Sequence, residues 1–240
     1  MPDISKGPDR FVFIVTYGRS GSTLLQNLMN AIPGYQIRGE NNNALLHMVQ
    51  TWRSIEASGP LKGMRLAQQA SDQTHPWFGG ELIDPDKVGH SLAKCFTETV
   101  LNPDPDVRVS GFKEIRFHAN QVAFPHYLDF IHRYFPNAKF VFNTRNHADV
   151  AKSGWWAERP PQAVLKILKQ AEQLYKGYLA KHPDRGLLMH YDDYVTDATA
   201  LRPLYDFLEE EMSMDVIESV MSKKLTHARR DKNKSKKGIK

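Results

Sequence analysis

The stretch that decides the fold reads Phe11-Val12-Phe13-Ile14-Val15-Thr16-Tyr17-Gly18-Arg19-Ser20-Gly21-Ser22-Thr23-Leu24-Leu25. Its first five residues are apolar and rich in aromatic and β-branched side chains, which predicts a strand buried on both faces. Two glycines then allow a tight turn with inward-pointing N–H groups. The spacing of the following leucines predicts an amphipathic helix over 23–31. Together these features predict an anion site, because unpaired N–H groups and the helix dipole both attract negative charge.

The turn departs from the phosphate loop of nucleotide triphosphatases, which reads G-x-x-x-x-G-K-[ST] and uses its Lys for the outer phosphates. Here Ser22 stands where that Lys would be, and the cation is Arg19, ahead of the second glycine. A glycine-rich turn without any ligand remains the alternative interpretation of these residues taken alone.

Composition limits the class of protein. A chain of 240 residues with 41% hydrophobic content can build one domain with a full core. No apolar run is long enough to span a bilayer, and the first ten residues are polar, so we expect neither a membrane span nor a secretory signal. Cys95 is the single cysteine, which excludes an intrachain disulfide and favours a cytoplasmic location.

The positive net charge of +5 is concentrated at the C-terminus. Residues 223–240 hold nine of the 32 Lys and Arg residues and one of the 27 acidic residues, so the rest of the chain is mildly acidic. We therefore expect a single domain over 1–222 followed by a basic tail. Such a tail is either a solvated end, a flap over a phosphate, or a patch for a polyanion.

Strands and helices alternate along the chain. Strands are predicted at 11–15, 35–38, 107–112, 138–143 and 186–189, and helices at 44–56, 85–101, 127–134, 149–153, 161–181, 201–208 and 216–221, with an irregular loop over 58–83. This pattern predicts an α/β fold like that of P-loop NTPases, with a mostly parallel sheet of about five strands and helices on both faces. Polar groups follow every strand, and one parallel sheet would bring them to a common edge. They are the 18–23 loop, Glu40, Lys113, Arg145 and the Tyr191-Asp192 pair.

A second motif joins a strand end to the next helix. Arg145 ends the fourth predicted strand, and Ser153 follows eight residues later, two turns into the expected helix. A guanidinium and a hydroxyl placed in this way can hold a second phosphate. The alternative is an Arg145–Asp149 ion pair beside a surface serine.

With both motifs in this order, the sequence resembles the sulfotransferases, enzymes that take the sulfuryl group from 3′-phosphoadenosine 5′-phosphosulfate. Arg-Ser-Gly-Ser-Thr-Leu-Leu resembles their 5′-phosphosulfate loop, and the resemblance extends over residues 11–46, 109–117, 138–156 and 187–195. It implies that the donor is bound by Gly18, Arg19, Ser20, Gly21, Ser22 and Thr23 at its 5′ end, by Arg145 and Ser153 at its 3′-phosphate, and by Tyr191 near the adenine or the 3′-phosphate.

The resemblance also implies catalytic residues. Lys113 is similar to a strand-end Lys that faces the sulfuryl group, and with Arg19 it would stabilise the developing charge without a metal ion. Glu40 resembles the general base of the tyrosylprotein and carbohydrate branches, where a segment ending in Gly-Glu follows the first helix. Cytosolic small-molecule members use a histidine instead, and His47 is the first alternative in this sequence.

The implied reaction is sulfuryl transfer to a hydroxyl group, releasing adenosine 3′,5′-bisphosphate. The expected acceptor is a carbohydrate or another small metabolite or glycan, with no nucleic acid as partner. The pattern leaves two other functions open. One is a P-loop kinase, although such an enzyme requires a Gly-Lys-Thr loop, and the other is a non-enzymatic polyanion-binding protein that uses the basic tail. It predicts nothing about the oligomeric state.

Overall fold

Five parallel strands form the centre of the protein. The computed structural model describes residues 7–67 and 71–223. The strands are β1 (Arg10–Val15), β2 (Tyr35–Arg38), β3 (Val109–Glu114), β4 (Lys139–Thr144) and β5 (Gly186–His190), and they lie in the order β2-β3-β1-β4-β5. Every neighbouring pair is parallel. The predicted α/β class and five-stranded parallel sheet are therefore confirmed.

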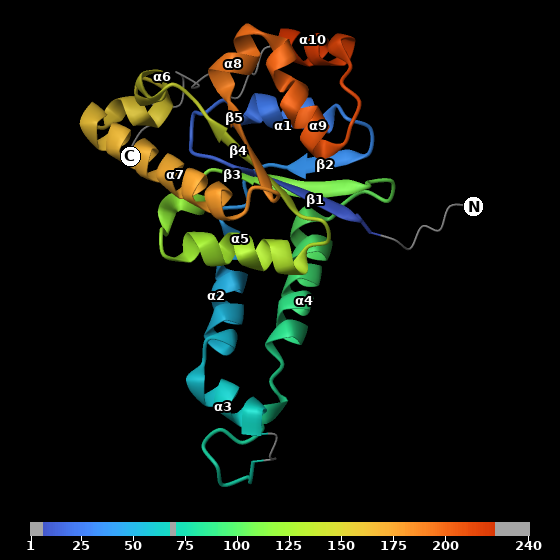
Figure 1. The fold of residues 1–240 in the computed structure, drawn as a ribbon, viewed down its shortest axis with the longest axis vertical. Coiled ribbons are helices and arrows are strands. Elements are labelled where there is room, and N and C mark those ends of the chain that lie inside the picture. Colours follow the sequence, from blue (N-terminus) through green and yellow to red (C-terminus); the bar gives the residue numbers. More distant parts are fainter. Residues whose placement is uncertain (1–6, 68–70, 224–240) are drawn as a thin grey trace, which may run out of the picture.

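Helices cover both faces of this sheet (Figure 1). One face carries α1 and the C-terminal helices, and the other carries α5, α7 and the upper parts of α2 and α4. The helices are α1 (Ser22–Asn30), α2 (Ala44–Glu56), α3 (Gly59–Ala67), α4 (Pro85–Phe96), α5 (Ala123–Tyr134), α6 (His147–Ala151), α7 (Pro161–Lys181), α8 (Tyr191–Thr196), α9 (Arg202–Leu208) and α10 (Met214–Ser222). Short helical turns are η1 (Gly80–Leu82), η2 (Thr97–Leu101, a π-helix), η3 (Phe117–Ala119), η4 (Gly154–Glu158) and η5 (Ala198–Leu201).

The apolar run of β1 explains why the sheet has two cores. Phe11, Phe13 and Val15 pack into the core shared with α2, α4, α5 and α7. Val12 and Ile14 point to the opposite face and pack with α1, α9 and α10. Because successive side chains of a strand alternate between faces, a strand covered by helices on both sides must be apolar throughout.

The region between β2 and β3 differs from its prediction. Figure 1 shows α2 and α4 running away from the sheet as an arm with α3 at its end. The irregular loop expected over 58–83 therefore contains α3 and the turn η1. Glycine at 59, 63, 79 and 80 hides the helical pattern in the sequence, because each glycine lowers helix propensity. No helix among the described residues is both long and apolar enough to cross a membrane.

The strand register brings the carboxyl ends of the strands to one edge. Ile14 pairs with Lys113, Val15 pairs with Phe142, and Thr144 pairs with His190. β3 extends two residues further than predicted, so Lys113 belongs to the strand itself. Ser153 was expected inside a helix, but α6 already ends at Ala151, and Ser153 precedes η4. The helix ends early because Ser153 and Gly154 have low helix propensity and Gly154 adopts a positive φ of 57°.

Candidate functional site

The glycine turn after β1 forms the floor of the site. Arg19 and Gly21 both have left-handed backbones, with φ angles of 69° and 78°. Gly21 caps α1 without any side-chain hydrogen bond, and no acidic residue lies in the first turn. Within the described residues, the N–H groups of Ser22 and Thr23 have no acceptor. Free N–H groups at a helix N-terminus, beside an arginine, form an anion-binding floor.

Tyr191, the first residue of α8, lies directly against this turn. A Cβ atom added at Gly21 would lie 2.0 Å from the ring of Tyr191. The guanidinium of Arg145 lies over the same ring, 4.6 Å from its centroid. Glycine is therefore required at position 21 both for its left-handed backbone and for the close approach of the tyrosine.

Buried polar side chains hold the turn from below. Asn143 donates its amide to the carbonyl oxygen of Ser20 at 3.0 Å and accepts the Tyr194 hydroxyl at 2.9 Å. The Thr16 hydroxyl lies 2.7 Å from Ser20 Oγ. The Ser20 side chain is fully buried. Its hydroxyl thus contributes to the support of the turn and does not line the cavity above it.

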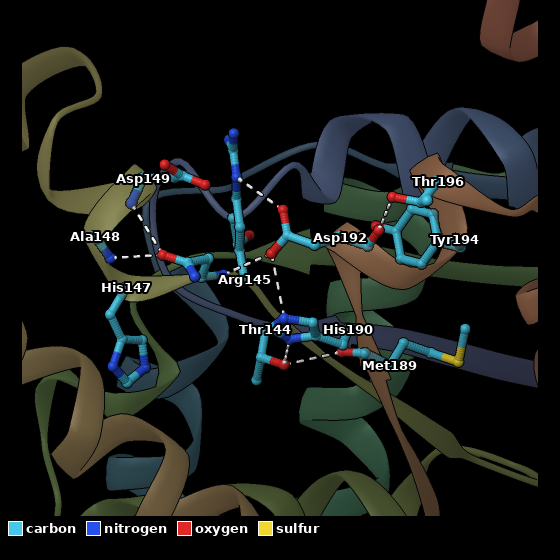
Figure 2. Close-up of polar contacts among 12 residues, drawn as sticks. Thr144, Arg145, His147, Ala148, Asp149, Met189, His190, Asp192, Tyr194 and Thr196 are labelled. Carbon is cyan, nitrogen blue, oxygen red and sulfur yellow. Dashed lines mark hydrogen bonds and ion pairs between the residues drawn. The ribbon is translucent and has the colours of Figure 1, made fainter.

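Arg145 stands at the end of β4 between two acidic side chains (Figure 2). Its Nε lies 3.9 Å from Asp192 Oδ1, and no ion pair with Asp149 is formed. Asp192 Oδ2 accepts the N–H of Asn146 at 2.7 Å, which fixes the carboxylate. Arg145 Nε is buried without a hydrogen-bond partner. A buried guanidinium nitrogen without a partner is costly, so the site is suited to an anionic ligand that completes it.

Arg19 connects the two predicted motifs. Its Nε donates to Ser153 Oγ at 2.9 Å, and its carbonyl oxygen accepts Arg145 Nη1 at 3.2 Å. The Arg19 guanidinium also lies 6.0 Å from the centre of the Trp155 ring. The loop and the Arg145/Ser153 pair are therefore in direct contact, although 126 residues separate Arg19 from Arg145.

Lys113 and Glu40 meet at the opposite wall. Lys113 Nζ donates to Glu40 Oε1 at 2.6 Å, and the Lys113 side chain is 8% exposed. Glu40 Oε2 lies 3.5 Å from Arg116 Nη1. Glu40 thus pairs with Lys113 and Arg116, whereas Arg38 turns away to the carbonyl oxygens of Leu101 and Asn102.

These groups line one cavity of about 390 Å³, which we call the strand-end cleft. Nine of its eleven lining residues are predicted site residues, namely Gly18, Arg19, Gly21, Ser22, Thr23, Glu40, Lys113, Arg145 and Tyr191. Ile115 and Trp155 complete the lining. Ser153 contacts Arg19 at the margin of the cleft but is not part of its lining.

A second cavity of about 480 Å³, the side chamber, adjoins the cleft. Gly18, Ile115 and Trp155 line both cavities. The remaining walls of the side chamber come from η3, η4 and α7 and from the residues next to them: Arg116, His118, Ala119, Gln121, Trp156, Arg159, Ile167, Gln170 and Ala171. None of these nine was predicted as a site residue.

Sequence reasoning also missed a buried support behind the cleft. The Tyr17 hydroxyl donates to Glu172 Oε1 at 2.9 Å and accepts the N–H of Arg145 at 2.9 Å. His147 Nε2 lies 2.8 Å from the same carboxylate oxygen. Burial raises the pKa of Tyr17 far above its usual value, and nearby Glu172 raises it further, so the phenol keeps its proton. A tyrosine directly before the glycine turn was the only sequence signal for this support.

The alternative base does not lie in either cavity. His47 is exposed on α2, and neither cavity lining includes it. The histidine that does line the side chamber is His118, whose pKa burial lowers below its usual value. Among the described residues, no group of three or more His, Cys, Asp or Glu side chains is arranged to hold a metal ion. The predicted basic tail over 223–240 lies, apart from Lys223, outside the described part of the chain.

Comparison with known proteins gives a family match. The sequence model described as the sulfotransferase family matches residues 11–214. The sulfotransferase domain of an olefin synthase from Synechococcus PCC 7002 is similar in structure, with a TM-score of 0.58 and 21% identity, covering 93% of this chain and 80% of that domain. A sulfotransferase domain from the curacin biosynthetic pathway has a TM-score of 0.51 and 17% identity, covering 88% of this chain and 77% of that domain. A search among curated proteins gave no match.

Proposed function

The chain belongs to the sulfotransferase family, and on this premise we propose that it transfers a sulfuryl group from 3′-phosphoadenosine 5′-phosphosulfate to a carbohydrate hydroxyl, with Glu40 as general base. Sulfuryl transfer and use of this donor follow from the family. The acceptor and the roles of individual residues are our proposal. The observation that carries it is the bridge made by Arg19, which joins two anion-binding groups within one cleft.

A donor with a 5′-phosphosulfate and a 3′-phosphate needs two such groups. The free N–H groups of Ser22 and Thr23, with Arg19, would bind the 5′ end. Arg145, whose buried Nε lacks a partner, would bind the 3′-phosphate together with Ser153. Tyr191, packed on Gly21, would contact the adenosine part. These residues fit the donor in number, charge and placement around a common cleft.

The chemistry assigned to the chain is mostly charge stabilisation and proton transfer. The bound donor supplies the sulfuryl group, and adenosine 3′,5′-bisphosphate leaves with the electrons of the broken O–S bond. Glu40 would take the proton of the acceptor hydroxyl as that oxygen bonds to sulfur. Lys113, held 2.6 Å from Glu40, would face the charge that develops on the sulfuryl oxygens. Arg19 would contribute a second positive charge on the other side.

A carbohydrate acceptor is supported by the side chamber. It opens beside Gly18 and Ile115, and its walls carry two tryptophans and two glutamines. Indole rings can stack against sugar rings, and amide side chains can both donate and accept hydrogen bonds to hydroxyl groups.

Calorimetric titration with adenosine 3′,5′-bisphosphate, ADP and a heparin fragment tests the donor site. We expect the bisphosphate to bind without magnesium and ADP to bind far more weakly. Arg145→Ala should remove about 2–3 kcal/mol of bisphosphate affinity, because a charged bidentate contact is lost, and should change ADP affinity little. Arg202→Ala, at an exposed arginine on α9, is the matched control.

Equal affinities of the wild-type protein for the two nucleotides would contradict the proposed donor site. Binding of heparin alone would instead support the polyanion-binding alternative, for which the basic tail is the predicted contact.

A further inference from the structure

The side chamber has an unusual balance of charge. Two of its lining residues are arginines, and none of the described residues that line it is acidic. Arg116 is already paired, with Glu114 at 3.1 Å and Glu40 at 3.5 Å. Arg159 has no carboxylate within ion-pair distance in the described part of the chain, and its guanidinium lies over the Trp156 ring, 5.4 Å from the centroid. Among the residues that the structure describes, the chamber therefore presents one arginine that forms no ion pair.

The aromatic wall between the two cavities is fixed in place. The Trp156 indole N–H donates to the carbonyl oxygen of Gly18 at 2.9 Å, so Trp156 is anchored to the start of the glycine turn. Trp155 packs against the same glycine, where an added Cβ would lie 2.3 Å from its ring. Trp155 is nevertheless 45% exposed. Its exposed part lies where the chamber joins the strand-end cleft, because it lines both cavities.

The side chamber adjoins the part of the cleft that holds Lys113 and Glu40. Ile115 and Trp155 line both cavities, and Ile115 follows Glu114 at the end of the strand that carries Lys113. A ring compound in the side chamber can therefore direct a hydroxyl past Ile115 toward Glu40. Arg159, Gln121 and Gln170 line the side chamber but not the cleft, and they would surround the rest of the compound.

We propose that the side chamber binds the acceptor and selects an anionic sugar, a hydroxyl-bearing ring with a carboxylate such as a uronate. Arg159 binds the carboxylate, and Trp155 stacks on the ring. This inference rests on the proposed function, because it assigns the acceptor of that reaction. The carboxylate takes no part in the chemistry: the acceptor oxygen bonds to sulfur, its proton passes to Glu40, and the donor oxygen leaves with the electrons of the broken bond.

The test compares two acceptors with the same ring hydroxyls, methyl glucuronide and its uncharged amide, methyl glucuronamide, in initial-rate assays with the sulfuryl donor. We expect wild-type kcat/KM to favour the glucuronide by about five- to tenfold, the range of a partly exposed charged contact. Arg159→Gln should remove this preference, mainly by raising KM for the glucuronide. Arg202→Gln, which removes a positive charge remote from both cavities, should keep the preference.

Each outcome bears on the inference. Equal use of the two acceptors by the wild-type enzyme, or a preference that survives in Arg159→Gln, would overturn it. Calorimetry with adenosine 3′,5′-bisphosphate separates its failure from that of the proposed function. If the bisphosphate binds but neither sugar is sulfated, the acceptor assignment is wrong and the donor site stands. If the bisphosphate does not bind, the proposed function and the acceptor inference are both contradicted. A circular dichroism spectrum like that of wild type confirms that Arg159→Gln is folded.

Discussion

The strand-end cleft and the side chamber are neighbours of similar size but opposite construction. The cleft is built from the carboxyl ends of parallel strands and the first turn of α1, and its charged groups bond to one another, as Lys113 does to Glu40. The side chamber is built from short turns and one long helix, and its Arg159 forms no ion pair with any residue that the structure describes, while its Trp155 is 45% exposed. A cleft with such internal bonds is preorganised for one ligand, whereas a chamber with an arginine that forms no ion pair in the described part of the chain and a half-exposed tryptophan can adapt to the ligand that it binds.

The largest effect is expected at the proposed base in the strand-end cleft. Glu40→Gln keeps the size of the side chain and removes its basicity. We expect turnover to fall by about 10²-fold or more, because a positioned base typically contributes ~10²–10⁴-fold. Bisphosphate affinity should stay within a few-fold of wild type, since Glu40 is not assigned to the donor. Steady-state kinetics with calorimetry measures both, and Glu218→Gln, at an exposed glutamate on α10, is the control. A variant that retains most of its turnover would exclude Glu40 as the base.

An intermediate effect should be confined to the cleft. Gly21→Ala forces a Cβ atom to within 2.0 Å of the Tyr191 ring, so the ring must shift. We expect about a tenfold loss of bisphosphate affinity and little change in acceptor KM. Gly79→Ala is a matched control, because Gly79 has a φ of 79° and no atom within 4 Å of an added Cβ. Both variants should lose about 1 kcal/mol of unfolding free energy through the left-handed backbone, measured by urea denaturation.

The comparison between these two glycines isolates the tyrosine contact. If Gly79→Ala weakens nucleotide binding as much as Gly21→Ala does, the effect comes from general destabilisation, and the preorganised character of the cleft is not supported.

The smallest effect concerns a wall of the side chamber. Burial lowers the pKa of His118 below its usual value near 6.5, and a hydrogen bond to the Thr16 backbone offsets part of this shift. The unfolded chain therefore takes up a proton at a higher pH than the folded protein does. The stability linked to His118 is present above pH 6.5 and decreases as the pH falls through this value toward the lower folded pKa.

Urea denaturation at pH 7.5, 6.5 and 5.5 measures this effect. His118→Asn should show a smaller decrease in unfolding free energy on acidification than wild type. His132, whose pKa is also lowered by burial, is present in both proteins and cancels in the difference. Parallel profiles for the two proteins would show that His118 does not titrate as described.

The cleft was predictable because its residues follow apolar strands at turn signals. Glu40, Lys113 and Arg145 each end or follow a strand, and parallel strands must deliver them to one edge. The side chamber was not predictable in this way. Trp155 and Arg159 lie in the short segment between α6 and α7, which has no periodicity, and their position depends on tertiary packing such as the Trp156 contact to Gly18. Tyr17 was missed because its role depends on Glu172, 155 residues away.

The small overlap between the two cavities has an evolutionary consequence. Only Gly18, Ile115 and Trp155 belong to both linings within the described residues. Substitutions at positions such as 121, 159 and 170 can therefore alter one cavity while the sheet edge that forms the other stays intact. With the acceptor in the side chamber, as we propose, gene duplicates of this chain would diverge in acceptor choice through a few point mutations in the turns and in α7. Substitutions at the three shared positions would be far more constrained, because each of them would change the lining of both cavities.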